Sequence, residues 1–286
     1  MQNARLAGPA LALLALLPLA ATSGCGVMDA LGIQKPTASI TGVKLQDIDL
    51  QSLTMLFDVE VDNPYSVPLP LVNVDYGLAS AGTSFLSGEA DVQGTVPAQG
   101  KRTISLPAKV TFQELLGALK GVKLGSVVPY KADLGLSVDA PAAGRLRVPM
   151  SKEGELPVPA PPDVSIQEIK WDPATLSSVG GTIKLAVGNP NQFPVDLGKL
   201  AYALTLGKTK VADASIAKPL ALAANGGKGT LEIPIKLSPT DLGASLLGMI
   251  TGDGAGYSLA GNAAINTPFG PMNLPVEKVG KTVFSR

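Results

Sequence analysis

The sequence predicts a mainly β chain that consists of two tandem antiparallel β-sandwich or barrel domains, each with about seven strands and one helix. One observation is the stretch at 57–65, FDVEVDNPY, in which apolar residues occupy every second position, as in a strand with one buried face. Another is the return of this stretch 126 positions later, at 183–191, as IKLAVGNPN. A period this long indicates duplicated domains and not a solenoid of short repeats.

The two copies align without a gap over 36–80 and 162–206, and then continue at an offset of 127. We therefore expect a first domain at 36–157, a second at 162–286, and a stiff proline-rich linker between them at 158–161. Domains of roughly 120 residues are long enough to bury a core of their own.

The strands of the first domain follow from alternation and from turn residues. A strand at 39–45 changes parity after Ile40, which suggests a β-bulge that the second copy repeats after Ile166. The next strand stops at Asn63-Pro64, because proline removes a backbone donor and Asn favours a turn. Further strands are expected at 72–78, 85–92, 102–110, 130–139 and 145–148.

One helix interrupts the strands in each copy. Thr111 and Glu114 have the spacing of a capping box, and the leucines at 115, 116 and 119 form a buried stripe. In the second copy the sequence SPTD at 238–241 plays the same part, with proline at the first helical position.

The composition excludes several classes of function. Lys plus Arg and Asp plus Glu both number 23, histidine is absent, and Cys25 is the only cysteine. The balanced charge gives no electrostatic reason to expect nucleic acid. A Ser-His or Cys-His catalytic pair, a His/Cys zinc site and an internal disulfide cannot be built from these residues. We therefore expect no enzyme, no cofactor and no metal.

Residues 1–24 are expected to be a signal peptide, with a positive charge, an apolar core and small residues before Cys25. The Ser-Gly-Cys ending resembles the lipobox of bacterial lipoproteins, in which the cysteine is lipidated, although Thr22 stands where that motif usually has Leu. Gly26 is not the Asp of the inner-membrane retention signal, so the resemblance implies an outer-membrane anchor facing the periplasm, with a tether at 25–35. An ordinary leader with an incidental cysteine is the alternative.

Alternating strands that end in Asn-Pro-Asn and are followed by proline and a Tyr-bearing strand resemble the water stress and hypersensitive response domain of the late-embryogenesis-abundant type 2 family. The motif residues are Asn189, Pro190 and Asn191 in one copy, and in the other they are Asn63, Pro64 and Tyr65, which departs at the third position. The resemblance implies an immunoglobulin-like β fold with one helix and a role in tolerance of desiccation, cold or other stress, without catalytic residues.

Two groups of carboxylates are candidate sites. Asp58, Glu60 and Asp62 line the outward face of one strand, where they could form a calcium ladder or simply a solvated face. Their counterparts in the second copy are Lys, Ala and Gly, so we expect a solvated face. Asp47 and Asp49 could be paired carboxylates, but no sugar cleft is indicated beside them.

The remaining motifs are expected to be structural. The glycine-rich stretch at 225–229 lacks the spacing of a phosphate-binding loop and precedes a strand, so it is interpreted as a hairpin turn. Four tyrosines are expected to place their rings in the core with the hydroxyls at its edge: Tyr76, Tyr130, Tyr202 and Tyr257.

These features together lead to a membrane-anchored, non-enzymatic envelope protein that protects proteins or membranes during desiccation or other stress. Its expected partners are the membrane, through the lipid anchor, and partly unfolded client proteins. The alternative is an envelope binding or transport module for an apolar ligand or a partner protein, which would need a contiguous cavity larger than about 300 Å³.

Overall fold

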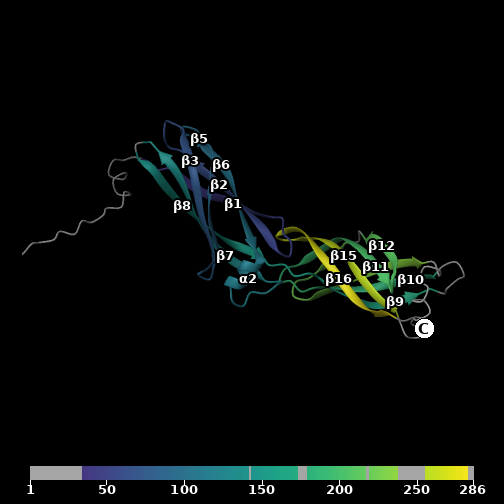
Figure 1. Ribbon diagram of the computed structural model, residues 1–286. Coiled ribbons are helices and arrows are strands. Elements are labelled where there is room, and N and C mark those ends of the chain that lie inside the picture. The colour runs from purple at the N-terminus through teal and green to yellow at the C-terminus, as the bar shows by residue number, and fades with distance from the viewer. Residues whose placement is uncertain (1–33, 142, 173–178, 217–218, 238–254, 283–286) are drawn as a thin grey trace, which may run out of the picture. The chain divides into compact units, whose positions relative to one another are not determined.

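The computed structural model describes residues 34–141, 143–172, 179–216, 219–237 and 255–282 (Figure 1). The expected signal peptide, Cys25 and most of the tether lie outside the described residues, as does the helix expected from 238. The described residues from Pro36 onward belong to one compact unit. Among them, no helix is both long enough and apolar enough to cross a membrane.

The first repeat consists of two antiparallel sheets and one helix, drawn in purple to teal in Figure 1. One sheet has three strands in the order β1-β2-β6, and the other has the order β4-β3-β7-β8 with β5 paired to β3. The elements are β1 (Thr37–Gln46), β2 (Ser52–Asp62), β3 (Leu69–Ser80), β4 (Thr83–Asp91), β5 (Thr95–Val96), β6 (Lys101–Thr111), α2 (Phe112–Ala118), β7 (Val127–Ala140) and β8 (Gly144–Pro157).

The second repeat has the same topology strand for strand. Its three-stranded sheet has the order β14-β10-β9, and its five-stranded sheet has the order β12-β11-β15-β16 with β13 paired to β11. The elements are β9 (Asp163–Trp171), β10 (Val179–Asn189), β11 (Val195–Leu206), β12 (Thr209–Ile216), β13 (Leu220–Leu222), β14 (Gly227–Leu237), β15 (Ala255–Thr267) and β16 (Gly270–Thr282). The predicted mainly β fold with two tandem antiparallel domains is confirmed.

The strand that ends at the Asn-Pro motif lies at the centre of the three-stranded sheet in each copy. In β2, Phe57, Val59 and Val61 are buried, while the residues between them are half-exposed. In β10 the buried residues are the three that the alternation predicts. Both strands therefore present one apolar face to the core of their own repeat.

The predicted bulges are present at equivalent positions. The pairing of β1 with β2 shifts register between Ile40 and Gly42, so Thr41 is the extra residue. The pairing of β9 with β10 shifts between Ile166 and Glu168, and Gln167 is the extra residue 126 positions later. Sequence parity alone located both bulges.

The helix α2 exists, but the expected capping box does not form as drawn from the sequence. Thr111 is the N-cap, yet its hydroxyl donates to the carboxylate of Glu114 and makes no bond to a backbone N–H. The N–H of Phe112 instead donates to the carbonyl of Gln51, at 2.7 Å. The helix thus has no side-chain cap, and of the predicted apolar stripe Leu115 and Leu119 are buried while Leu116 is half-buried.

The four tyrosines each stand opposite a glycine on the neighbouring strand. The pairs are Tyr76 with Gly88, Tyr130 with Gly154, Tyr202 with Gly261, and Tyr257 with Gly280. A Cβ added at Gly154 would lie only 2.7 Å from the hydroxyl oxygen of Tyr130, and one at Gly280 would lie 2.5 Å from that of Tyr257. In the pairs Tyr130–Gly154 and Tyr257–Gly280 the ring therefore covers the glycine, an arrangement that stabilises a β-sheet at positions occupied by glycine. Burial also raises the pKa of Tyr130.

Gly154→Val is expected to destabilise the protein by about 1–3 kcal/mol, because the new side chain displaces the Tyr130 ring from its place on the sheet. Gly77→Val is the matched control, since a Cβ at Gly77 meets no atom within 4 Å. Urea unfolding of both variants measures the difference. Equal urea midpoints for the two variants would show that the stability of the protein does not depend on the contact between the Tyr130 ring and Gly154.

Candidate functional site

The side chain of Asn63 is completely buried and joins two loops of the first repeat. Its Nδ2 donates to the carbonyl oxygens of Val67, Val96 and Pro97, at 2.9, 3.2 and 2.9 Å. Its Oδ1 accepts from the N–H of Tyr65 at 3.0 Å. The amide thus holds the turn after β2 against the loop before β6, where few backbone groups can pair with a strand.

Asn189 performs the same task in the second repeat. Its Nδ2 donates to the carbonyl oxygens of Phe193, at 2.8 Å, and Ala223, at 3.0 Å. Its Oδ1 accepts from the N–H of Asn191 at 3.0 Å. The prolines that follow both asparagines disfavour helical backbone at the asparagine, so each strand leads directly into its turn. In both copies the motif therefore positions backbone around a buried amide.

The glycine-rich loop faces the Asn-Pro turn in each copy, but it is not the hairpin turn expected from the sequence: β13 pairs with β11 and β14 with β10, so the loop joins strands of two different sheets. The N–H of Asn225 donates to the carbonyl of Asn191 at 2.7 Å, and the N–H of Gln99 donates to that of Tyr65 at 2.8 Å. Asn225 and Gln99 have φ values of 58° and 49°. The left-handed backbone explains why Asn occupies this position in one copy, since Asn tolerates that conformation better than most residues.

The third motif position has different surroundings in the two copies. Asn191 is buried, its Oδ1 accepts from the N–H of Ala160 at 2.8 Å, and its Nδ2 donates to the Ala160 carbonyl at 3.2 Å. The neighbouring Gln192 donates its N–H to the carbonyl of Gly125 at 2.7 Å and accepts from the N–H of Val127 at 2.9 Å. The turn of the second repeat is therefore bonded to the linker and to the loop before β7.

Tyr65 replaces this asparagine in the first repeat and makes no such contacts among the described residues. Its side chain is half-buried, and its hydroxyl is buried without a hydrogen-bond partner in the described part of the chain. Burial raises the pKa of this hydroxyl. The same turn is thus a polar junction in one copy and an aromatic end in the other.

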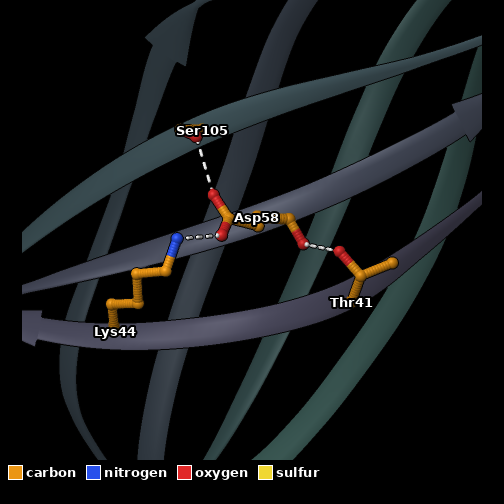
Figure 2. A network of polar contacts seen from close by, with 4 residues as sticks. All are labelled: Thr41, Lys44, Asp58 and Ser105. Carbon is orange, nitrogen blue, oxygen red and sulfur yellow. Dashed lines mark hydrogen bonds and ion pairs between the residues drawn. The ribbon is translucent and has the colours of Figure 1, made fainter.

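The carboxylates on the outward face of β2 pair with lysines and hydroxyls from the adjacent strands. Figure 2 shows Asp58 between β1 and β6, accepting from Lys44 Nζ at 2.9 Å and from Ser105 Oγ at 2.7 Å, while its backbone carbonyl accepts from Thr41. The hydrogen bond from Ser105, and then that from Lys44, lowers the pKa of Asp58.

Further along the strand, Lys101 Nζ lies 2.7 Å from Glu60 and 3.9 Å from Asp62. Within the described ranges, no group of three His, Cys, Asp or Glu residues is placed to hold a metal ion. The three carboxylates of β2 therefore form a solvated, cross-paired face, whose exposed ion pairs add little stability.

The two aspartates between β1 and β2 serve the turn itself. Asp49 Oδ1 accepts from the N–H groups of Gln51 and Ser52, both at 2.7 Å, and Asp47 has a φ of 50°. This is the local bonding that favours aspartate in turns. The carboxylate of Asp49 thus accepts hydrogen bonds from the backbone of its own turn.

One ion pair was not foreseen from the sequence. Arg147 on β8 reaches across β7 to Asp75 on β3, with its Nε 2.9 Å from Asp75 Oδ1 and a second bond from the same guanidinium. A Cβ at Gly135, on the strand between them, would lie 2.1 Å from the guanidinium carbon. The glycine leaves the space for this pair, whose hydrogen bonds lower the pKa of Asp75.

One small pocket lies among apolar side chains of the second repeat. It is lined in part by Val187, Leu200 and Ile265 and has a volume of about 10 Å³, roughly the room that a single water molecule needs. Two larger grooves, of about 590 and 700 Å³, lie along Lys152–Glu155 and are lined in part by charged residues. They lie on the surface, not between sheet and helix.

Comparison with known sequences gives matches in both repeats. The family model described as late embryogenesis abundant protein matches residues 58–154 and 184–280. A soybean (Glycine max) desiccation protectant protein Lea14 homolog is 35% identical over 130 residues, which is 46% of this chain and 86% of that protein. The cotton (Gossypium hirsutum) late embryogenesis abundant protein Lea14-A is 30% identical over 132 residues, 46% of this chain and 87% of its own length.

Among solved structures, the solution structure of an Arabidopsis thaliana late embryogenesis abundant protein is 26% identical, with a TM-score of 0.40, and covers 48% of this chain and 80% of that protein. Another Arabidopsis thaliana solution structure is 29% identical with a TM-score of 0.38, covering 44% of this chain and 84% of its own. Each of these relatives matches slightly less than half of the chain, which is the length of one repeat.

Proposed function

The chain belongs to the late embryogenesis abundant protein family, and from this premise we propose that it is a lipid-anchored, non-enzymatic envelope protein that protects proteins or membranes during desiccation or related stress. A stress- and desiccation-related role follows from the relatives, which include a desiccation protectant protein. The observation that carries the proposal is the match of the family model to both repeats, at 58–154 and 184–280. Two modules on one anchor give two protective surfaces per chain.

The surface of the described residues favours weak and sequence-tolerant contact with clients. Only Val67, Leu124 and Val279 are large apolar residues with high exposure in the described part of the chain. They lie in the β2–β3 loop, in the α2–β7 loop and on β16. Edge strands such as β1, β6, β4 and β8 instead offer backbone donors and acceptors, which can pair transiently with an exposed segment of a client.

A non-enzymatic role is consistent with the chemistry of the chain. Histidine is absent, and the aspartates first considered for catalysis or metal binding bond to turn N–H groups, lysines and a serine hydroxyl. The alternative, carriage of an apolar ligand in a core, gains no support from the pocket of about 10 Å³ among the described apolar residues of the second repeat.

We propose that the lipid anchor is attached to Cys25, because small residues precede it and Cys25 is the only cysteine, so that the chain offers it no disulfide partner. Cys25→Ser is expected to abolish fatty-acid incorporation and to leave the protein soluble or uncleaved in the envelope. Metabolic labelling with a radioactive fatty acid, followed by membrane fractionation, measures both effects. Absence of label from the unaltered protein would exclude the anchor.

The protective function is tested by freeze-thaw of an aggregation-prone enzyme. Protein starting at residue 26 is expected to preserve more enzyme activity than albumin at equal mass. The Val61→Asp/Val187→Asp double variant, in which both cores are disrupted, is expected to lose this advantage. Protection no better than that by albumin, or full protection by a demonstrably unfolded double variant, would contradict the proposal that the folded modules act.

A further inference from the structure

The loops at the end of the first repeat at which β1 begins are uncharged, and Lys35, Asp62 and Lys101 flank them. Strand pairing of Thr37 with Asp62, and of Asp62 with Lys101, brings the start of β1 beside the loops at 63–68 and 97–100. The β7–β8 hairpin lies at the same end, near β5 (Figure 1). Its described loop residues are Pro141 and Ala143, and none of the residues in these loops is charged.

Several of these loop residues are apolar and exposed. Val67 is 44% exposed, Pro68 and Pro97 are also exposed, and Tyr65 is half-buried. The loops at the opposite end of the same repeat contain Asp47, Asp49, Lys120 and Lys123. The two ends of one domain thus differ in the kind of surface they offer.

The second repeat shows what covers this end when a protein domain precedes it. Its turn is bonded through Asn191 to Ala160 and through Gln192 to Gly125 and Val127. Phe193, the counterpart of Val67, is only 3% exposed, and it packs edge-to-face on Phe269 of its own repeat, with ring centroids 5.4 Å apart.

The first repeat lacks the side chains that make this protein junction. Tyr65 and Ser66 stand where the second repeat has Asn191 and Gln192, whose side-chain and backbone groups bond to the preceding segment. Val67 stands where the second repeat has the buried phenylalanine. The first repeat therefore lacks the amides of this junction and presents uncharged, partly apolar residues at 66–68, where the Tyr65 ring is half-buried and its hydroxyl is buried.

The chain also enters the first repeat at this end. Only the ten residues at 26–35 separate Cys25 from Pro36, so a fully extended tether spans at most about 33 Å. If the cysteine carries the lipid, as the proposed function states, the nearest surface to residues 63–68 is the bilayer.

We propose that the end of the first repeat formed by the uncharged loops at 63–68 and 97–100 rests on the lipid surface to which Cys25 is attached. This inference depends on the proposed lipid anchor. Val67, Pro68 and Pro97 contact the interfacial region of the bilayer. The second repeat is not part of this contact and remains available to clients.

The test uses the full-length lipidated protein in vesicles of phosphatidylethanolamine and phosphatidylglycerol. Val67→Cys is labelled with an environment-sensitive NBD dye, and Val279→Cys, on β16, is the matched control because it is an exposed valine in the second repeat. Lipids with brominated chains are expected to quench most of the emission at position 67 and to leave the emission at 279 unchanged. A blue shift is expected only at position 67.

The outcomes separate this inference from the anchor itself. Dye uptake by the unaltered chain, together with failure to float with vesicles, would mean that Cys25 is a free thiol and would overturn both. Vesicle-bound protein whose probe at 67 is not quenched would overturn the inference alone. A blue shift at 67 without quenching by brominated lipid would also overturn it, because a protein partner, such as a second copy of the chain, would then cover this end.

Discussion

Val61→Asp is expected to unfold the first repeat while the strands of the second remain protected from hydrogen exchange. Val61 is completely buried on the core face of β2, the central strand of its sheet. An aspartate there must either bury an unpaired charge or bind a proton, and both states leave polar atoms without partners. The loss, on the order of 4 kcal/mol or more, is comparable with the whole stability of a small domain.

The control for this variant is Thr54→Asp, which places the same residue on the outward face of the same strand. Thr54 pairs with Lys109 of β6, so a carboxylate there meets solvent and a nearby cation. Thr54→Asp is expected to change the free energy of unfolding by no more than about 0.5 kcal/mol. Hydrogen exchange followed by mass spectrometry distinguishes the two repeats, and native-like protection of β2 in Val61→Asp would contradict the assigned orientation of this strand.

The central strands could be predicted from the sequence because their determinants are local. The alternation of 57–62 and 183–188 fixes which residues are buried, and a single change of parity fixes each bulge at Thr41 and Gln167. The second copy supports these predictions, because a chance pattern would not be expected to recur at the equivalent positions. The turn at 225–229 was equally local, because its residues specify left-handed backbone.

The parts that sequence did not reveal depend on pairing between distant strands. That Tyr130 covers Gly154 follows only from the register of β7 with β8, and the Arg147–Asp75 pair needs three strands in order with Gly135 between them. Thr111 is the N-cap, but the side-chain bonds to backbone N–H groups expected of a capping box are absent. The N–H of Phe112, the first helical residue, donates to Gln51, about sixty positions earlier in the chain, which no local motif indicates.

The Asn-Pro motif combines both situations. Its place at the end of a strand was visible in the sequence, but the acceptors of Asn63 at Val96 and Pro97 are 33 and 34 positions away. The consequence of having Tyr65 at the third motif position likewise depends on a tertiary contact, since Asn191 in the other copy is bonded to Ala160. The sequence shows where this short motif lies, whereas the hydrogen bonds that explain it join residues far apart in the chain.

Asn63→Asp is expected to destabilise the first repeat by about 3–5 kcal/mol at neutral pH, although the two side chains have nearly the same shape. The amide donates to three carbonyl oxygens from a fully buried position. A carboxylate at this position would have no proton to donate and would face those oxygens with its negative charge. The same change at Asn189 is expected to act on the second repeat, where the amide donates to two carbonyl oxygens.

The pH dependence of Asn63→Asp separates charge repulsion from simple loss of hydrogen bonds. Burial against carbonyl oxygens would raise the pKa of the new carboxyl in the folded state above its unfolded value of about 3.9. The destabilisation is therefore complete above that raised pKa, and it shrinks as the pH falls through it, because the protonated carboxyl can again donate one bond. Asn63→Leu, which has no titrating group, should be destabilised to the same extent relative to the parent chain throughout this range. Urea unfolding between pH 4 and 8 measures both variants against the parent, and a pH-independent loss in Asn63→Asp would show that Asn63 is not the buried donor that links the two loops.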